Sequence, residues 1–157
     1  MKTDFQFQAL SKTIFKPLMD MDDEQLNTRD ARWILVDSEP GYPCRVSLVD
    51  ASVGERVLAL SFFHHDVKSP YRASGPIFVR EHATKATPAV NEIPTMLLNR
   101  KLSIRAYNSE HLLIEAEVTN GTELESSIRK LFKNENAAYL HIHNASPGCF
   151  NCSVHRA

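Results

Sequence analysis

Apolar and polar residues alternate along several short stretches of the chain, and this pattern predicts β-strands. The clearest example is a β-hairpin in which a short polar segment joins the alternating runs 102–107 and 112–118. Residues 56–63 are apolar on both faces, as in a central strand. Further strands are expected at residues 5–9, 32–36, 77–81, 139–144 and 150–156.

A helical period is clear in one segment, which follows Gly121. Its apolar residues have the i, i+4, i+7 and i+8 spacing of one helix face: Leu124, Ile128, Leu131 and Phe132. Thr122 and Glu125 fit a capping box, so we expect one main helix over residues 122–133. Strands come in runs rather than alternating with helices, which indicates the α+β class with a mostly antiparallel sheet of about seven strands. A partly closed barrel is the alternative.

Size and charge restrict the protein classes to consider. The 157 residues fit a single domain, residues 1–157. A net charge of −1 provides no general field that favours nucleic acid or an anionic membrane surface. No apolar run approaches the roughly 20 residues of a membrane helix, and residues 1–5 lack a signal-like apolar segment. We therefore expect a cytoplasmic protein that binds neither nucleic acid nor membranes.

Two histidines and a cysteine near residue 145 form the first candidate site. In a strand over residues 139–144, His141 and His143 share one face while the apolar residues between them enter the core. A Pro-Gly turn would return Cys149 to the side of this strand. His141, His143 and Cys149 could therefore hold a divalent metal such as zinc.

The same residues allow nucleophilic catalysis. A neighbouring imidazolium lowers the pKa of a thiol, so His141, His143 and Cys149 are also candidate catalytic residues. Cys44 is the other candidate, because Arg45 follows it directly. The alternative is that these histidines make only structural hydrogen bonds and that the thiols are buried and unreactive.

Arginines suggest a third chemistry. Arg45 and Arg80 each follow a turn-forming stretch, and a guanidinium group binds carboxylate or phosphate through paired hydrogen bonds. Together with the two histidines they would form a pocket for a small anionic molecule. Arg105 is instead expected to pair with a glutamate of a neighbouring strand, and His64 and His65 to be solvated at a strand end.

Three stretches of the sequence also resemble one family: PCRVSL (43–48), PYRASGPIFVRE (70–81) and YLHIHNA (139–145). Taken together they resemble the uncharacterised bacterial family known as domain of unknown function 1203, over nearly the whole chain. The resemblance covers Cys44, Arg45, Tyr71, Gly75, Arg80, His141, His143, Asn144, Gly148 and Cys149. It adds Tyr71 and Asn144 to Arg45, Arg80 and Cys44 as candidate ligand-binding residues. Cys152 lies outside the pattern, and the family implies no activity.

The sequence thus predicts one polar site where strand ends meet, and it leaves three functions open. The first is an enzyme or binding protein for a small anionic molecule, with a histidine as general acid or base. The second is a non-catalytic interaction or structural module. The third is a metalloprotein built on the His-x-His strand. No motif decides between an enzyme and a binding protein.

Overall fold

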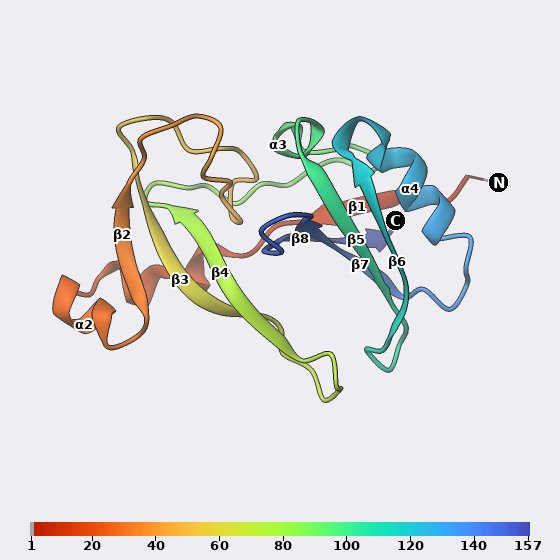
Figure 1. Ribbon diagram of the computed structural model, residues 1–157, viewed down its shortest axis with the longest axis horizontal. Helices are drawn as coiled ribbons and strands as arrows, with labels where there is room; N and C mark the ends of the chain where they lie inside the picture. The colour runs from red at the N-terminus through yellow and green to blue at the C-terminus, as the bar shows by residue number, and fades with distance from the viewer. Residues whose placement is uncertain (1) are drawn as a thin grey trace.

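A computed structural model describes residues 2–157 and contains two antiparallel sheets that lie side by side (Figure 1). The larger sheet has five strands in the order β1-β8-β7-β5-β6. They are β1 (Phe5–Gln8), β5 (Lys101–Tyr107), β6 (Leu113–Asn120), β7 (Tyr139–Asn144) and β8 (Phe150–Arg156). The smaller sheet has the order β2-β3-β4, with β2 (Ala31–Leu35), β3 (Arg56–His65) and β4 (Ala73–Arg80). The α+β class is confirmed, and within residues 2–157 neither sheet closes into a barrel.

The helices are short. They are α1 (Lys16–Met19), α2 (Asp23–Asn27), α3 (Thr95–Leu98) and α4 (Leu124–Leu131), with the 3-10 turns η1 (Lys12–Ile14) and η2 (Gly121–Glu123). Helix α4 is the main helix that the apolar spacing predicts. The expected capping box is wrong, because η2 forms the first turn and no side chain caps α4 at Glu123. No helix within residues 2–157 is long and apolar enough to span a membrane.

Each sheet has its own apolar core. One face of the five-stranded sheet packs against α4, through Leu102 and Ile104 of β5, Leu140 and Ile142 of β7, and Ile128 of the helix. Burying each of these aliphatic side chains contributes roughly 1.5–3 kcal/mol. A second cluster fills the space around β3 and β4. The opposite face of the larger sheet is therefore free to carry polar residues.

Strand register determines which polar residues meet on that face. Strands β5 and β7 pair antiparallel, and Arg105 lies opposite His141. A register shift in the β7–β8 pair places Phe150 opposite His143 and leaves Asn151 as the extra residue. A bulge of this kind re-aims side chains, and here it turns the Phe150 ring onto the histidine face.

Candidate functional site

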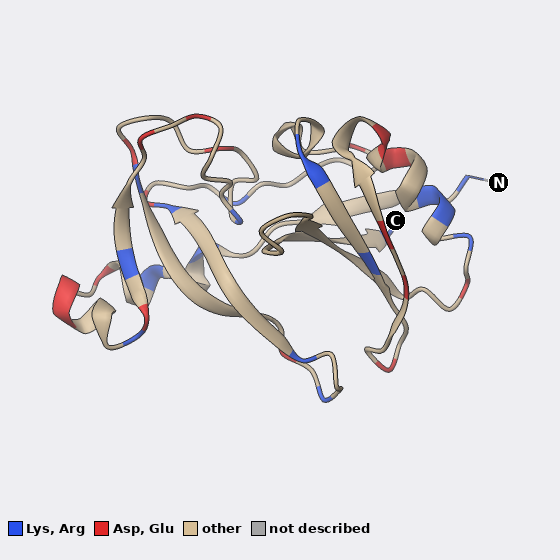
Figure 2. Cartoon of the chain, viewed as in Figure 1, with Lys and Arg blue, Asp and Glu red and all other residues tan. Residues whose placement is uncertain are grey.

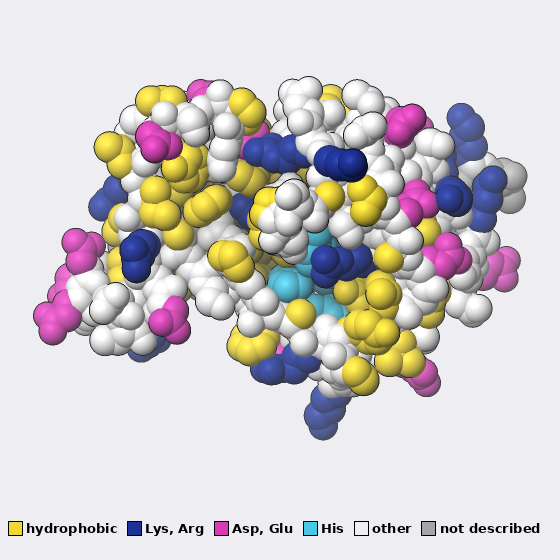
Figure 3. All heavy atoms as spheres, viewed as in Figure 1, with side chains coloured by type: hydrophobic (Ala, Val, Ile, Leu, Met, Phe, Trp, Pro, Cys, Tyr) yellow, Lys and Arg dark blue, Asp and Glu magenta, His cyan; other side chains and the backbone are white. Residues whose placement is uncertain are grey.

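Four histidines meet between the two sheets. His141 and His143 come from β7, whereas His64 and His65 come from the last residues of β3. The ring centroids of His64 and His143 are 5.0 Å apart, as are those of His65 and His141. Phe150 stacks on His64 at 5.3 Å. Figure 3 shows the histidine side chains in a hollow between the two halves of the molecule.

The expectation that His64 and His65 are solvated is wrong. His65 is 3% exposed, and the His64 Nδ1 atom is buried. The pairing of β3 with β4 is irregular between Phe62 and His65, which allows both adjacent imidazoles to face the other sheet. The alternation of apolar and polar residues in the sequence does not predict this bulge.

Burial keeps the imidazoles of His64, His141 and His143 neutral. Desolvation is the main cause that lowers the pKa of His141 to about 2, that of His143 to about 3 and that of His64 to about 4. Neighbouring histidines and Arg105 lower these pKa values further. A general acid or base works best with a pKa near the working pH, so the cluster is better suited to hydrogen bonding by neutral rings.

Three nitrogens of this cluster are buried and have no hydrogen-bond partner among residues 2–157: His64 Nδ1, His141 Nδ1 and His143 Nε2. His143 Nδ1 lies 2.9 Å from the carbonyl oxygen of Gly148 and must donate to it. Within the described residues, however, no three His, Cys, Asp or Glu side chains are placed to hold a metal ion. The expected set of His141, His143 and Cys149 is thus not arranged as three ligands.

A chain of hydrogen bonds connects the sheets at the other end of the cluster. His65 Nδ1 lies 2.7 Å from the carbonyl oxygen of Tyr71 and donates to it, so His65 Nε2 accepts from the Tyr139 hydroxyl at 2.6 Å. His111 Nδ1 then donates to the same hydroxyl oxygen at 2.8 Å. Burial raises the pKa of Tyr139 to about 12, so the phenol keeps its proton.

We expect Tyr139→Phe to lower the free energy of unfolding by about 1–2 kcal/mol, because it leaves a buried histidine nitrogen without a partner. Urea denaturation at pH 7.5 measures the change. The matched control is Tyr42→Phe, which removes an exposed hydrogen bond to Asp37 and should change stability by less than about 0.5 kcal/mol. Equal effects of the two substitutions would contradict a structural role for the Tyr139 hydroxyl.

A pocket of about 500 Å³ lies beside the histidines. It is bounded by the β2–β3 connection, β4, the start of β5 and the β7–β8 turn. Its lining comprises Gly41, Pro43, Arg45, Pro76, Phe78, Arg100, Lys101, Asn144, Ser146, Pro147 and Cys149. Strand β5 carries basic residues and no acidic ones (Figure 2).

Arg45 is the most unusual residue of this pocket. Its side chain is 0% exposed, its Nε donates to the Phe150 carbonyl at 2.7 Å, and Nη1 donates to the Pro43 carbonyl. Its Nη2 is buried without a hydrogen-bond partner, and no carboxylate within residues 2–157 forms an ion pair with it. Burial lowers the pKa of Arg45, and the charge interaction with Cys149 opposes this. A buried charge without a counterion costs several kcal/mol.

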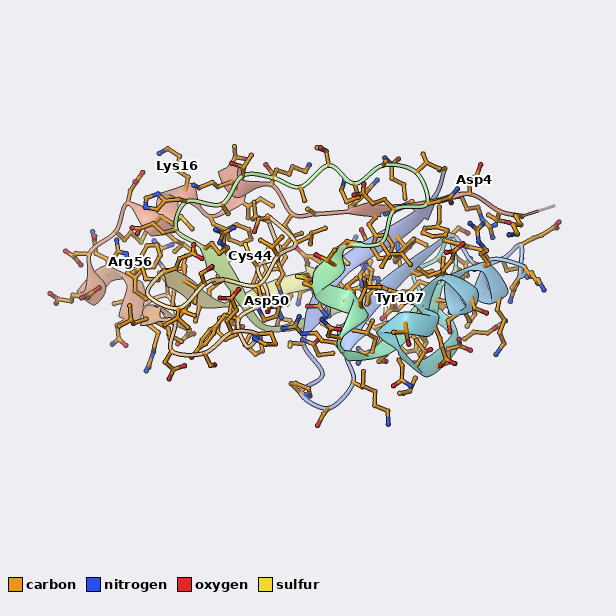
Figure 4. The ribbon with its side chains drawn as sticks, turned by 90° about the horizontal axis from the view of Figure 1, so that it is seen from above. Asp4, Lys16, Cys44, Asp50, Arg56 and Tyr107 are labelled. Atoms are coloured by element: carbon orange, nitrogen blue, oxygen red, sulfur yellow. The ribbon has the colours of Figure 1, made fainter. Side chains whose placement is uncertain are left out.

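The other two cations of the pocket differ from Arg45. The guanidinium of Arg100 donates two hydrogen bonds, of 2.6 and 2.9 Å, to the carboxylate of Asp50, which is labelled in Figure 4. The positive charge of Arg100 is therefore already compensated. Lys101 is exposed, and its amino group forms no ion pair among the described residues. The pocket thus has one buried and one exposed cation without an acidic partner.

The structure separates the residues that the sequence proposed for one site. Arg45, Asn144 and Cys149 line the pocket, whereas the two histidines of β7 are not part of its lining. Cys44 is fully buried, and its sulfur accepts from the backbone N–H of Arg80 at 3.3 Å. The remaining two candidates also lie outside the pocket lining: Arg80, which pairs with Glu55 at 2.9 Å, and Tyr71, which is 40% exposed.

Arg105 corrects a further expectation. It forms no ion pair with a glutamate within residues 2–157, so the expected pairing is wrong. Its charge instead lies close enough to lower the pKa of His64 and of His143. The alternation of β5 correctly predicts that Arg105 and Ile104 lie on opposite faces of the sheet. The sequence does not predict which residues of the other sheet lie near Arg105.

Comparison with known proteins gives one match. A family model described as protein of unknown function (DUF1203) matches residues 41–156, which include the whole lining of the pocket and the four histidines between the sheets. The curated proteins and the solved structures gave no match.

Proposed function

The chain belongs to the family of proteins of unknown function DUF1203, and we propose that its pocket binds a small organic molecule with a carboxylate or phosphate group. The observation that carries this proposal is the buried guanidinium of Arg45, which has no acidic partner and one unpartnered nitrogen. A bound anion would supply both a counter-charge and a hydrogen-bond acceptor.

The rest of the pocket supports an anion attached to an apolar body. Pro43, Pro76 and Phe78 contribute apolar walls, and the Phe78 ring lies 5.8 Å from the guanidinium carbon of Arg45. Lys101 adds a second, solvent-exposed cation to the lining. A volume of about 500 Å³ is within the range of small-molecule sites. An organic acid therefore fits these surroundings better than a bare inorganic ion.

We expect benzoate and phenyl phosphate to bind, and their neutral counterpart benzamide to bind at least about tenfold more weakly, because only an anion compensates Arg45. Titration calorimetry measures affinity, and thermal shift provides a first screen. Arg45→Lys keeps the charge but loses the planar fork, so it should lower affinity by about 10- to 100-fold.

Two further variants make the result interpretable if Arg45→Lys folds poorly. Lys101→Ala removes an exposed side chain and should weaken binding several-fold without loss of structure. Arg80→Lys is the matched control, because Arg80 is paired with Glu55 outside the pocket and should not affect binding. The proposal fails if benzamide binds as tightly as benzoate, or if Lys101→Ala and Arg80→Lys behave alike.

A further inference from the structure

The three cysteines have different surroundings. Cys44 and Cys152 are 0% exposed and lie in the apolar clusters, and burial raises the pKa of Cys152. Cys149 is partly exposed and lines the pocket. It is therefore the cysteine that combines access for a small molecule with a polar environment.

The β7–β8 turn holds Cys149 against the end of β7. The N–H of Asn144 donates to the Cys149 carbonyl at 2.9 Å, and the N–H of Gly148 donates to the Asn144 carbonyl at 2.9 Å. Gly148 has a φ of 84°, in the left-handed region that glycine adopts without strain. The backbone of Cys149 is thus fixed at the edge of the pocket by hydrogen bonds of the turn.

One hydrogen-bond donor points at the sulfur. The Asn144 Nδ2 donates to Cys149 Sγ at 3.1 Å, and the Asn151 Nδ2 donates to the Asn144 Oδ1 at 2.9 Å, which fixes the orientation of the Asn144 amide. Arg45 adds a nearby positive charge from the same pocket. The sulfur of Cys149 is thus held in a fixed, polar position within the pocket.

Arg45 is a second, independent sign of a ligand here, because its Nη2 is buried and unpartnered in the pocket that Cys149 lines. Arg45 and Cys149 interact within the same pocket lining, so a carboxylate held by Arg45 would place its adjacent carbon atoms near the sulfur of Cys149. This arrangement orients an electrophilic carbon for attack, which is the positional part of nucleophilic catalysis.

We propose that Cys149 is a nucleophile that forms a covalent bond to an electrophilic carbon next to the carboxylate of a small organic acid bound in this pocket. The inference rests on the proposed anion site. With an α-keto acid, the sulfur–carbon bond forms as the carbonyl π-electron pair moves to oxygen, and that oxygen takes up the thiol proton. The product is a thiohemiketal, and no leaving group or oxidant is required.

Iodoacetate tests this chemistry irreversibly. Sulfur attacks its methylene carbon, the carbon–iodine bond breaks, iodide leaves with the electron pair, and the thiol proton goes to solvent. Iodoacetamide is the neutral analogue. The measured quantity is the ratio of the labelling rate with iodoacetate to the labelling rate with iodoacetamide. We expect this ratio to be at least about tenfold higher for Cys149 than for glutathione, because only iodoacetate carries a carboxylate that can bind Arg45. Intact-mass spectrometry gives the rates, and peptide mapping locates the label.

The controls separate this inference from the anion site itself. Cys149→Ser should abolish labelling of the folded protein, and Lys101→Ala should reduce the preference for iodoacetate whereas Arg80→Lys should not. Benzoate should slow labelling by iodoacetate in proportion to its occupancy. If benzoate binds but Cys149 reacts like glutathione, the covalent role is overturned and the anion site stands. If benzoate neither binds nor protects, the proposed function itself has failed.

Discussion

Lowering the pH from 7 to about 4.5 is expected to remove several kcal/mol of stability, because the folded protein keeps histidines neutral that the unfolded chain protonates. His141 and His143 have folded-state pKa values of about 2 and about 3, against about 6.5 for a freely solvated histidine. Below pH 6.5 the unfolded state therefore binds more protons, and stability falls as pH decreases.

The size of this effect is large for two side chains. Each group that is protonated only when unfolded costs up to about 1.4 kcal/mol per pH unit, so the pair costs up to roughly 2.7 kcal/mol per unit. Over two units this amounts to up to about 5.4 kcal/mol, against a total stability of about 5–15 kcal/mol for typical proteins. His64 acts in the same direction, because its pKa is lowered to about 4.

Urea denaturation at half-unit steps between pH 7.5 and 4.5 measures the slope. His143→Gln cannot be protonated and should reduce the slope by about 1.4 kcal/mol per pH unit. The control is His82→Gln, which replaces a histidine whose side chain is 86% exposed, and the comparison is between the slopes of the two variants. A stability that does not change between pH 7 and pH 5 would show that the histidines are not held neutral.

The substitution with the largest expected effect is Gly121→Ala. A Cβ at this position would lie 1.8 Å from the Leu97 carbonyl oxygen and 2.7 Å from the Leu98 carbonyl. Both are backbone atoms at the end of α3, so the contact is relieved only if η2 and α3 move apart. We expect a loss of at least about 3 kcal/mol in the free energy of unfolding.

The Gly121→Ala substitution should also disturb the pocket, because Gly121 contacts the backbone of Arg100. The N–H of Gly121 donates to the carbonyl of Arg100 at 2.8 Å. Arg100 lines the pocket, and its side chain donates to Asp50. The matched control is Gly75→Ala, since a Cβ there meets nothing within 4 Å and should change stability by less than about 1 kcal/mol. Equal thermal midpoints for the two variants would disprove the steric argument.

Local patterns predicted the parts of the fold that depend on neighbours in sequence. The expected hairpin is present as β5 and β6, paired from Lys101 opposite Asn120 to Tyr107 opposite Leu113. The face assignment of β7 is also confirmed, with Leu140 and Ile142 in the apolar core. Alternation determines which face each residue occupies, so these features needed no tertiary information.

The composition of the site depended on contacts that no local pattern contains. Which strand lies beside β7 is a matter of topology, and the register shifts in β3 and β8 change the direction of His64, His65 and Phe150. The position of the pocket likewise depends on tertiary contacts, because the buried Arg45 side chain donates to the carbonyl of Phe150, just after the β7–β8 turn. A list of plausible residue types was therefore available from sequence, but their grouping was not.

The pairing of β1 with β8 has a consequence for biosynthesis. Phe5 lies opposite Arg156 and Gln8 opposite Ser153, so β1 has no partner until β8 has left the ribosome. At about 5–20 residues per second, this interval is of the order of 10 to 30 s. Throughout it Phe5 and Phe7, both buried in the finished fold, remain available to chaperones or to other nascent chains. The five-stranded sheet is thus completed only once β8 has been synthesised.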